Sequence, residues 1–297
     1  MRRVSRTATV LGMALWCRRA ARRRHIDWQP PGGAVHHGTL TARHVGDAGA
    51  PVLLLHGLAA SGRVFGAAFD SLGDGHRLIV PDVLGFGESP TPNTGYGPEQ
   101  HVDAILGCTT ELGCDDEPMI VAGHSMGALL AIHLAARHPE RVRAVVAFAP
   151  PLYQDPDEAR LRIAGLGLMA RLFALDTRWA HAACQWVCDH RDLAATLAQV
   201  LRPDLPGPIA RDGVHHTWAS YSQSLRQVIL AADTRTLVPT LGMPVHFIVG
   251  DRDAIAPPDL LGGLNAPRAT VSIWDADHDV ELTRPQQCVE AIASAAD

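Results

Sequence analysis

The sequence lacks lysine, any apolar run long enough to cross a bilayer, and any pair of cysteines spaced as metal ligands. All 26 basic residues are arginine, which we attribute to composition bias rather than to function. A spanning helix needs about 20 apolar residues, whereas the apolar stretch between Arg6 and Arg18 has eleven. There is also no internal repeat, and the hydrophobic content of 47% argues against disorder.

The cysteines are scattered along the chain and contain no CxxC pair, so they do not predict a zinc site. We interpret all six as reduced residues with packing roles in a cytoplasmic protein. They are Cys17, Cys108, Cys114, Cys184, Cys188 and Cys288.

The charge is unevenly distributed. Residues 1–24 contain eight arginines and no acid, whereas the remainder has 18 arginines against 31 acidic residues. A body that acidic is not expected to bind nucleic acid over a broad face. We interpret residues 1–32 as a basic tail, and the alternative is a basic amphipathic segment in peripheral contact with an anionic membrane. The expected location is cytoplasmic, or membrane-associated under that alternative.

Short apolar runs alternate with helical patterns, which predicts an open α/β sheet. The continuous apolar character of the runs is typical of buried parallel strands. Strands are predicted at 52–57, 77–82, 118–123, 143–148, 244–250 and 269–274, with weaker ones near 34–38 and 40–46. Helices are predicted near 62–72, 98–113, 126–138, 257–264 and 285–295.

The alternation stops after residue 151, and residues 152–235 contain helical patterns but no convincing strand. An insertion on the carboxyl side of parallel strands lies over the usual ligand crevice. We therefore predict a core formed by residues 33–151 and 236–297, and a helical lid formed by residues 152–235.

One short stretch, PMIVAGHSMGALL, places Ser125 between a predicted strand and a predicted helix. Gly123 and Gly127 flank it and allow backbone and helix to approach closely. The pattern indicates a nucleophile elbow, in which the serine hydroxyl projects above the sheet from a tight turn. The N–H of Met126 points from the helix N-terminus into the same space, where negative charge is stabilised.

A serine hydroxyl needs a base and an acid that orients the base. In this architecture they follow in the order serine, acid, histidine. One later strand runs into Asp251 and Asp253, and the next runs into a segment that contains His278. These residues all follow the carboxyl ends of strands, on the side of Ser125, and their positions alone leave both aspartates open.

These motifs together resemble the α/β-hydrolase superfamily, in the lid-bearing branch of carboxylesterases, lipases and carbon–carbon bond hydrolases. The resemblance implies that Ser125 is the nucleophile and His278 the general base. It favours Asp253 over Asp251 as the acid, because the acid usually ends a G-x-x-D pattern. It also implies an oxyanion hole formed by the N–H groups of Leu58 and Met126. The motifs are HG (56–57), DVLGFGES (82–89), GHSMG (123–127), GDRDAIAP (250–257) and HDVELTRP (278–285).

The segment around His278 departs from the pattern of the superfamily. Asp277 stands where glycine is frequent, and Thr283 stands where an acid is frequent, with Glu281 nearer to the histidine. Asp277 and Asp279 flank His278 and are expected to alter its proton affinity or to offer competing hydrogen bonds.

The leading hypothesis is a serine hydrolase that cleaves a small apolar ester or related acyl compound, without metal or organic cofactor. One alternative is a carbon–carbon bond hydrolase of a vinylogous diketone. It is suggested by DVLGFGES, although Asp279 replaces the tryptophan that usually follows the histidine in those enzymes. The other is a catalytically silent fold used for binding. Ser125 excludes dehalogenase and epoxide hydrolase chemistry, which uses aspartate at that position.

Overall fold

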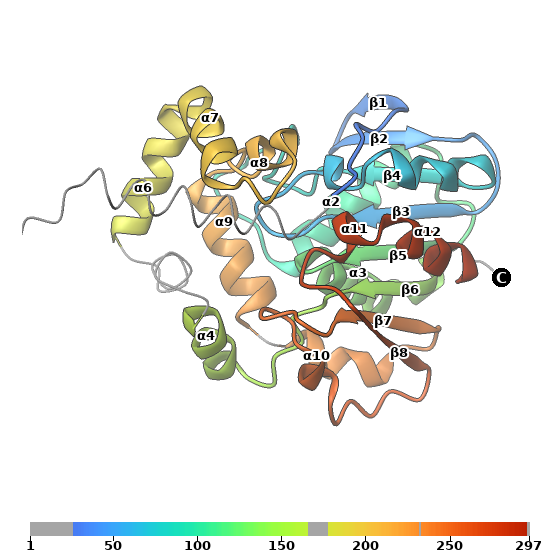
Figure 1. Ribbon diagram of the computed structural model, residues 1–297. Coiled ribbons are helices and arrows are strands. Elements are labelled where there is room, and N and C mark those ends of the chain that lie inside the picture. The colour runs from blue at the N-terminus through green and yellow to red at the C-terminus, as the bar shows by residue number, and fades with distance from the viewer. Residues whose placement is uncertain (1–25, 166–177, 232, 296–297) are drawn as a thin grey trace, which may run out of the picture.

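The computed structural model of the chain describes residues 26–165, 178–231 and 233–295. At its centre lies a sheet of eight strands in the order β1-β2-β4-β3-β5-β6-β7-β8 (Figure 1). The two pairs that involve β2 are antiparallel and the other pairs are parallel, which confirms the predicted fold class. The strands are β1 (Ala34–His37), β2 (Thr41–Val45), β3 (Pro51–Leu55), β4 (Arg77–Pro81), β5 (Met119–His124), β6 (Val142–Phe148), β7 (Val245–Gly250) and β8 (Ala269–Trp274).

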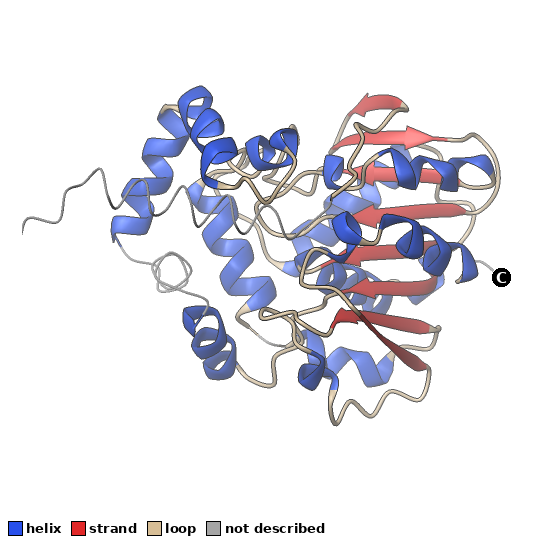
Figure 2. Ribbon diagram, viewed as in Figure 1, coloured by secondary structure: helices blue, strands red, loops and turns tan. Residues whose placement is uncertain are grey.

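Helices cover both faces of the sheet (Figure 2), which explains why the central strands are apolar throughout. Leu53 of β3 faces a core shared with α2 and α3, whereas its neighbour Leu54 faces a second core shared with η2 and α12. Alternate residues of one strand therefore fill different cores. The helices of the two layers are α2 (Pro98–Glu111), α3 (Met126–Arg137), η2 (Ala67–Asp74), α10 (Thr234–Leu237), α11 (Val280–Thr283) and α12 (Pro285–Ser294).

Two predicted helices are wrong in type. The segment predicted as a helix at 62–72 forms two 3-10 turns, η1 (Gly62–Val64) and η2, and that at 257–264 is reduced to the 3-10 turn η6 (Pro258–Leu261). Gly66 is extended between η1 and η2, and Gly263 has a φ of 70° just after η6. Glycine favours such conformations and interrupts a helix.

The strand β8 was predicted to be buried, and this is wrong. Val271 and Ile273 are 52% and 58% exposed. The reason is topological, since β8 is the last strand in the sheet order and pairs only with β7.

Between β6 and β7 the described residues form helices and no β-strand, and these helices lie beyond the carboxyl ends of the parallel strands (Figures 1 and 2). Residues 166–177 of the predicted lid lie outside the described part. The division into core and lid, and the role of the insertion as a lid, stay predictions. The elements are α4 (Pro156–Gly165), α6 (Arg178–Asp189), α7 (Arg191–Leu201), α8 (Gly207–Asp212), α9 (Trp218–Ser224) and the π-helical turn η4 (Leu225–Ile229).

The segment before β1 packs against the body of the protein from residue 26, earlier than the predicted tail boundary at residue 32. Trp28 donates from Nε1 to the carbonyl of Arg63 at 3.0 Å, and the carbonyl of Gln29 accepts from the N–H of Ala67 at 3.0 Å. Burial of the Trp28 ring against a core explains the difference. Residues 1–25, on which the membrane-contact alternative rests, lie outside the described residues.

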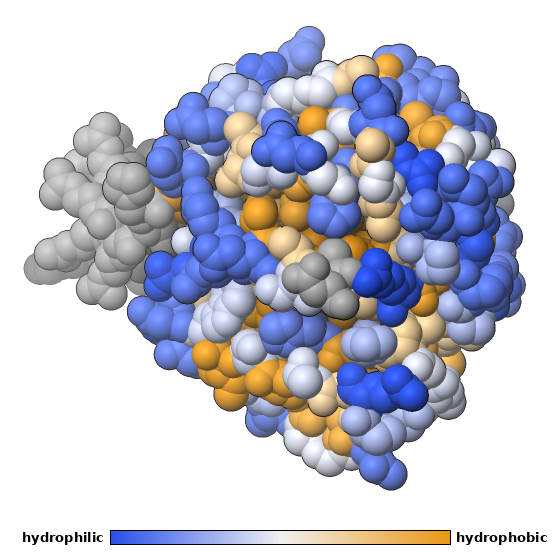
Figure 3. All heavy atoms as spheres, turned by 90° about the vertical axis from the view of Figure 1, so that its right-hand side faces the viewer, coloured by the Kyte–Doolittle hydropathy of each residue, from blue (hydrophilic) through white to orange (hydrophobic). Residues whose placement is uncertain are grey.

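Among the described residues, no helix is both long enough and apolar enough to span a membrane. Figure 3 shows the face on which the parallel strands begin, away from the inserted helices, where hydrophobic residues are exposed among hydrophilic ones.

Of the cysteines, Cys17 lies outside the described residues and the other five carry free thiols.

A side chain at Gly127 is expected to destabilise the protein strongly. A Cβ there would overlap the backbone of Leu55 and His56, so Gly127→Ala should lower the free energy of unfolding by about 1–3 kcal/mol. The control is Gly242→Ala, where a Cβ meets nothing within 4 Å and we expect a change within about 0.5 kcal/mol. Urea unfolding of the two variants measures both values, and equal stabilities would contradict the close approach of α3 to β3.

Candidate active site

The turn that carries Ser125 is strained. Ser125 has φ 52° and ψ −117°, a region that residues with a side chain rarely occupy. Its N–H donates to the carbonyl of Phe148 on β6 at 2.9 Å, and a Cβ at Gly123 would overlap the backbone of Gly127. The close packing of β5, β6 and α3 thus holds the turn, as the elbow pattern predicts.

Ser125, His278 and Asp253 lie in one chain of hydrogen bonds. His278 Nε2 is 3.1 Å from Ser125 Oγ, and His278 Nδ1 is 2.8 Å from Asp253 Oδ2. The residues come from the ends of β5, β7 and β8. The structure therefore brings together all three residues that the sequence motifs singled out, in the geometry of a nucleophile, a base and an orienting acid.

Asp253 is held as an ionised acceptor. Its Oδ1 accepts from the N–H groups of Ile255 and Ala256 at 2.8 and 2.9 Å. Burial acts to raise the pKa of Asp253, but the hydrogen bond and charge of His278 and these two N–H donors together lower it below the usual value. Its side chain is 0% exposed, so the carboxylate can bind little other than the histidine.

The rival acid, Asp251, faces elsewhere. Its Oδ1 accepts from the N–H of Ala276 at 3.2 Å and lies 3.2 Å from the guanidinium of Arg252. Asp251 thus ties together the ends of β7 and β8, whereas Asp253 touches the ring of His278.

Both predicted oxyanion donors lie close to the elbow. Met126 is the first residue of α3, so its N–H has no acceptor within the helix. Leu58 lines the same cavity as Ser125, and a Cβ on the preceding Gly57 would be 3.3 Å from Cβ of Ser125. These positions agree with donors that face a developing oxyanion, and the role itself stays a prediction.

His56 braces the loop that carries Leu58. Its Nδ1 is 2.8 Å from the carbonyl of Gly57, and its Nε2 accepts from the N–H of Val83 at 2.8 Å. Burial lowers the pKa of His56, so the ring is neutral with its proton on Nδ1. The imidazole thus connects this loop to the one after β4.

A cavity of about 730 Å³ opens beside Ser125 and His278. Its wall includes apolar side chains of the insertion that sequence reasoning missed. The sequence shows that the insertion has apolar helical faces, but which of these faces turns toward the cavity depends on packing. The apolar lining from the insertion comprises Ile163, Ala198, Leu205, Ile209, Ala210, Val214, Leu225 and Ile229.

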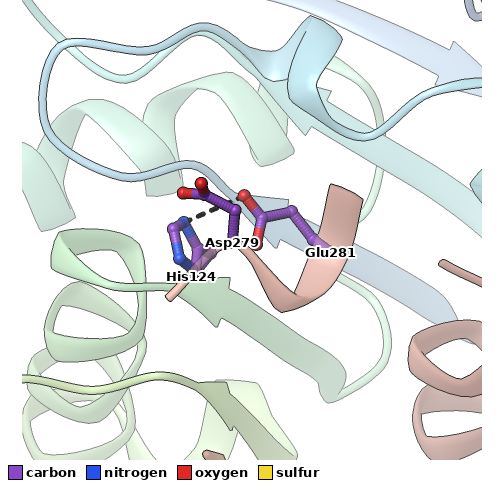
Figure 4. Close-up of side chains that lie close together, drawn as sticks. All are labelled: His124, Asp279 and Glu281. Atoms are coloured by element: carbon purple, nitrogen blue, oxygen red, sulfur yellow. Dashed lines mark ion pairs between the residues drawn. The ribbon is translucent and has the colours of Figure 1, made fainter. Parts of the chain in front are cut away.

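A second cluster behind the elbow was also missed. His124, Asp279 and Glu281 converge there (Figure 4), and their ligand atoms all lie within 4.8 Å of one another. The cluster brings one imidazole and two carboxylates close together. The sequence signal was the shifted acid, Glu281 in place of an acid at residue 283.

A sequence profile described as the alpha/beta hydrolase fold matches residues 50–285. A probable lysophospholipase of Arabidopsis thaliana, BODYGUARD 4, is 30% identical over 266 residues, which cover 82% of this chain and 63% of the relative. The chain therefore spans less than two thirds of that relative's length.

Two further proteins are similar over most of the chain. A pimeloyl-[acyl-carrier protein] methyl ester esterase of Neisseria meningitidis is 28% identical over 218 residues, which cover 71% of this chain and 78% of the relative. The crystal structure of an enol-lactonase from Burkholderia xenovorans superposes with a TM-score of 0.65 at 22% identity, covering 88% of this chain and 99% of the other.

Proposed function

This chain belongs to the alpha/beta hydrolase fold family, and we propose that within it the chain hydrolyses carboxylic esters or related acyl compounds through an acyl-enzyme on Ser125. The observation that carries the proposal is the hydrogen-bonded chain from Asp253 through His278 to Ser125, placed on a strained elbow. Its setting at the edge of an apolar cavity supports an organic acyl substrate.

The geometry supports a two-step reaction. His278 Nε2 takes the proton of Ser125 Oγ, 3.1 Å away, while the oxygen attacks the substrate carbonyl. The negative charge then develops beside the N–H groups of Met126 and Leu58, and each such donor contributes about 3–4 kcal/mol in related sites. His278 returns the proton to the departing alcohol, and a water molecule activated by the same ring releases the acid.

The cavity favours an apolar acyl group. Its wall from the insertion is largely aliphatic, while charged groups such as Arg202, Asp204 and Arg252 also line it. A polar acyl chain would leave its groups without partners against the aliphatic wall. The similarity to a probable lysophospholipase and to a methyl ester esterase supports an ester or acyl substrate.

A fluorophosphonate probe and a series of p-nitrophenyl esters test the proposal. We expect one adduct by intact mass, on Ser125, and hydrolysis that peaks at one acyl length because the cavity is finite. Absence of an adduct on the folded protein would favour the binding-protein alternative. Turnover of a ring-fission dienone without any ester turnover would favour the carbon–carbon bond hydrolase.

A further inference from the structure

His124 is connected directly to the candidate base. It precedes Ser125 in the chain, and its Nε2 lies 2.9 Å from the backbone carbonyl of His278. A carbonyl only accepts, so Nε2 of His124 carries a hydrogen. The other nitrogen, Nδ1, lies 3.2 Å from Oε1 of Glu281 (Figure 4).

We infer that one proton lies between Nδ1 of His124 and Oε1 of Glu281, because two bare acceptors 3.2 Å apart would repel each other. It belongs either to a neutral carboxylic acid or to an imidazolium paired with a carboxylate. Glu281 is 2% exposed, and its second oxygen, Oε2, has no hydrogen-bond partner within the described ranges. A buried carboxylate with one free oxygen is unfavourable, so the geometry favours the neutral acid.

The burial and the charges around the two side chains also favour a neutral His124 and a neutral Glu281. Burial, together with the repulsion of the His278 charge, lowers the pKa of His124 to about 4. Burial raises the pKa of Glu281, and the negative charge of Asp279 raises it further. The titratable groups that face Glu281 from the packed elements are mostly acids and histidines: His124, Asp253, Asp277, His278, Asp279 and Cys288, with Asp27 in the wall of a neighbouring cavity.

We propose that Glu281, as a neutral acid, and His124 are positioning residues for the base His278. The acid donates from Oε1 to Nδ1 of His124, and Nε2–H of His124 donates to the carbonyl of His278. The inference rests on the proposed function for its catalytic consequence, and on the contact with His124 and the burial of Glu281 for its protonation state.

The chain of donors serves two purposes. It fixes the backbone of His278 relative to the elbow, because His124 and Ser125 are adjacent residues. It also keeps the ring of His124 neutral, 4.8 Å from the ring of His278. A cationic His124 at that distance would oppose the imidazolium that His278 becomes during the reaction.

Substitutions at Glu281 separate hydrogen bonding from packing. The amide of Glu281→Gln donates to Nδ1 as the acid does, so kcat should stay within about threefold of the wild type. Glu281→Leu fills the space without a donor, and misplacement of the base should lower kcat by about 10- to 100-fold with KM little changed. The matched controls are Glu290→Gln and Glu290→Leu, at an exposed position on α12. Equal kcat values for Glu281→Gln and Glu281→Leu would overturn the positioning role.

The protonation state is tested by stability, without reference to activity. A folded-state pKa above the unfolded value means that the folded protein retains a proton that the unfolded chain releases. Stability therefore falls as the pH rises through that window. Above the usual pKa of a glutamate in an unfolded chain, about 4.3, the folding equilibrium constant of the wild type should fall relative to that of Glu281→Gln as the pH rises. Parallel curves would overturn the neutral acid.

Nitrogen-15 spectra of histidine-labelled protein give a second reading, with His124→Asn used to assign the signal. We expect a neutral ring protonated on Nε2 at pH 7. An imidazolium signal would overturn the proposal, because it would show that the proton lies on His124 and that Glu281 is ionised. If the protein did not react with the fluorophosphonate but gave the expected histidine spectrum, the proposed function would be wrong. The arrangement of Glu281 and His124 would still be supported.

Discussion

Ser125→Ala is expected to abolish hydrolysis. With the nucleophile removed, kcat on the best p-nitrophenyl ester should fall by about 10⁴- to 10⁶-fold, as in other triads. The fold should persist, because alanine keeps the Cβ and the strained backbone of the elbow, and among the described residues the hydroxyl of Ser125 hydrogen-bonds to His278 alone. Steady-state kinetics and intact mass after the fluorophosphonate measure the two losses.

A surface serine provides the control. Ser71 is exposed, and its hydroxyl donates to the carbonyl of Ala68 at 2.9 Å, so Ser71→Ala should retain full activity and the adduct. If Ser125→Ala kept both the adduct and turnover, the nucleophile would lie elsewhere and the proposed function would be wrong.

Asp253→Asn should cause the second largest loss, about 10⁴-fold in kcat. An asparagine cannot stabilise the imidazolium, and its amide favours the wrong tautomer of His278, whose Nδ1 is 2.8 Å from Asp253 Oδ2. Kinetics on the same ester measure the effect. The variant should still react slowly with the fluorophosphonate, since Ser125 remains in place.

Asp251→Asn is the matched control, because the two aspartates are two residues apart on the same loop. Its contacts with Ala276 and Arg252 are at least partly available to an amide oxygen, so kcat should stay within about threefold. Equal losses in the two variants would mean that the loop, rather than one carboxylate, supports the base. A larger loss in Asp251→Asn would reverse the assignment of the acid.

Local pattern was sufficient for much of the fold. The continuous apolar runs predicted β3 to β8, and the central strands among them are apolar because they are buried on both faces. The errors in the predicted helices also have causes in the local sequence. Glycine and proline shortened the predicted helices at 62–72 and 257–264 to 3-10 turns, and no local feature revealed that β8 is the edge of the sheet.

The sequence by itself determined the elbow at Ser125, because strand, glycine, serine and helix follow one another within a few residues. It also limited the acid to two aspartates. Tertiary structure alone brought Asp253 rather than Asp251 to His278, joined Glu281 to His124 and chose which helical faces line the cavity. These contacts join residues far apart in the chain, as between His278 and Ser125, 153 positions away, and depend on how β5, β7 and β8 end at one edge of the sheet.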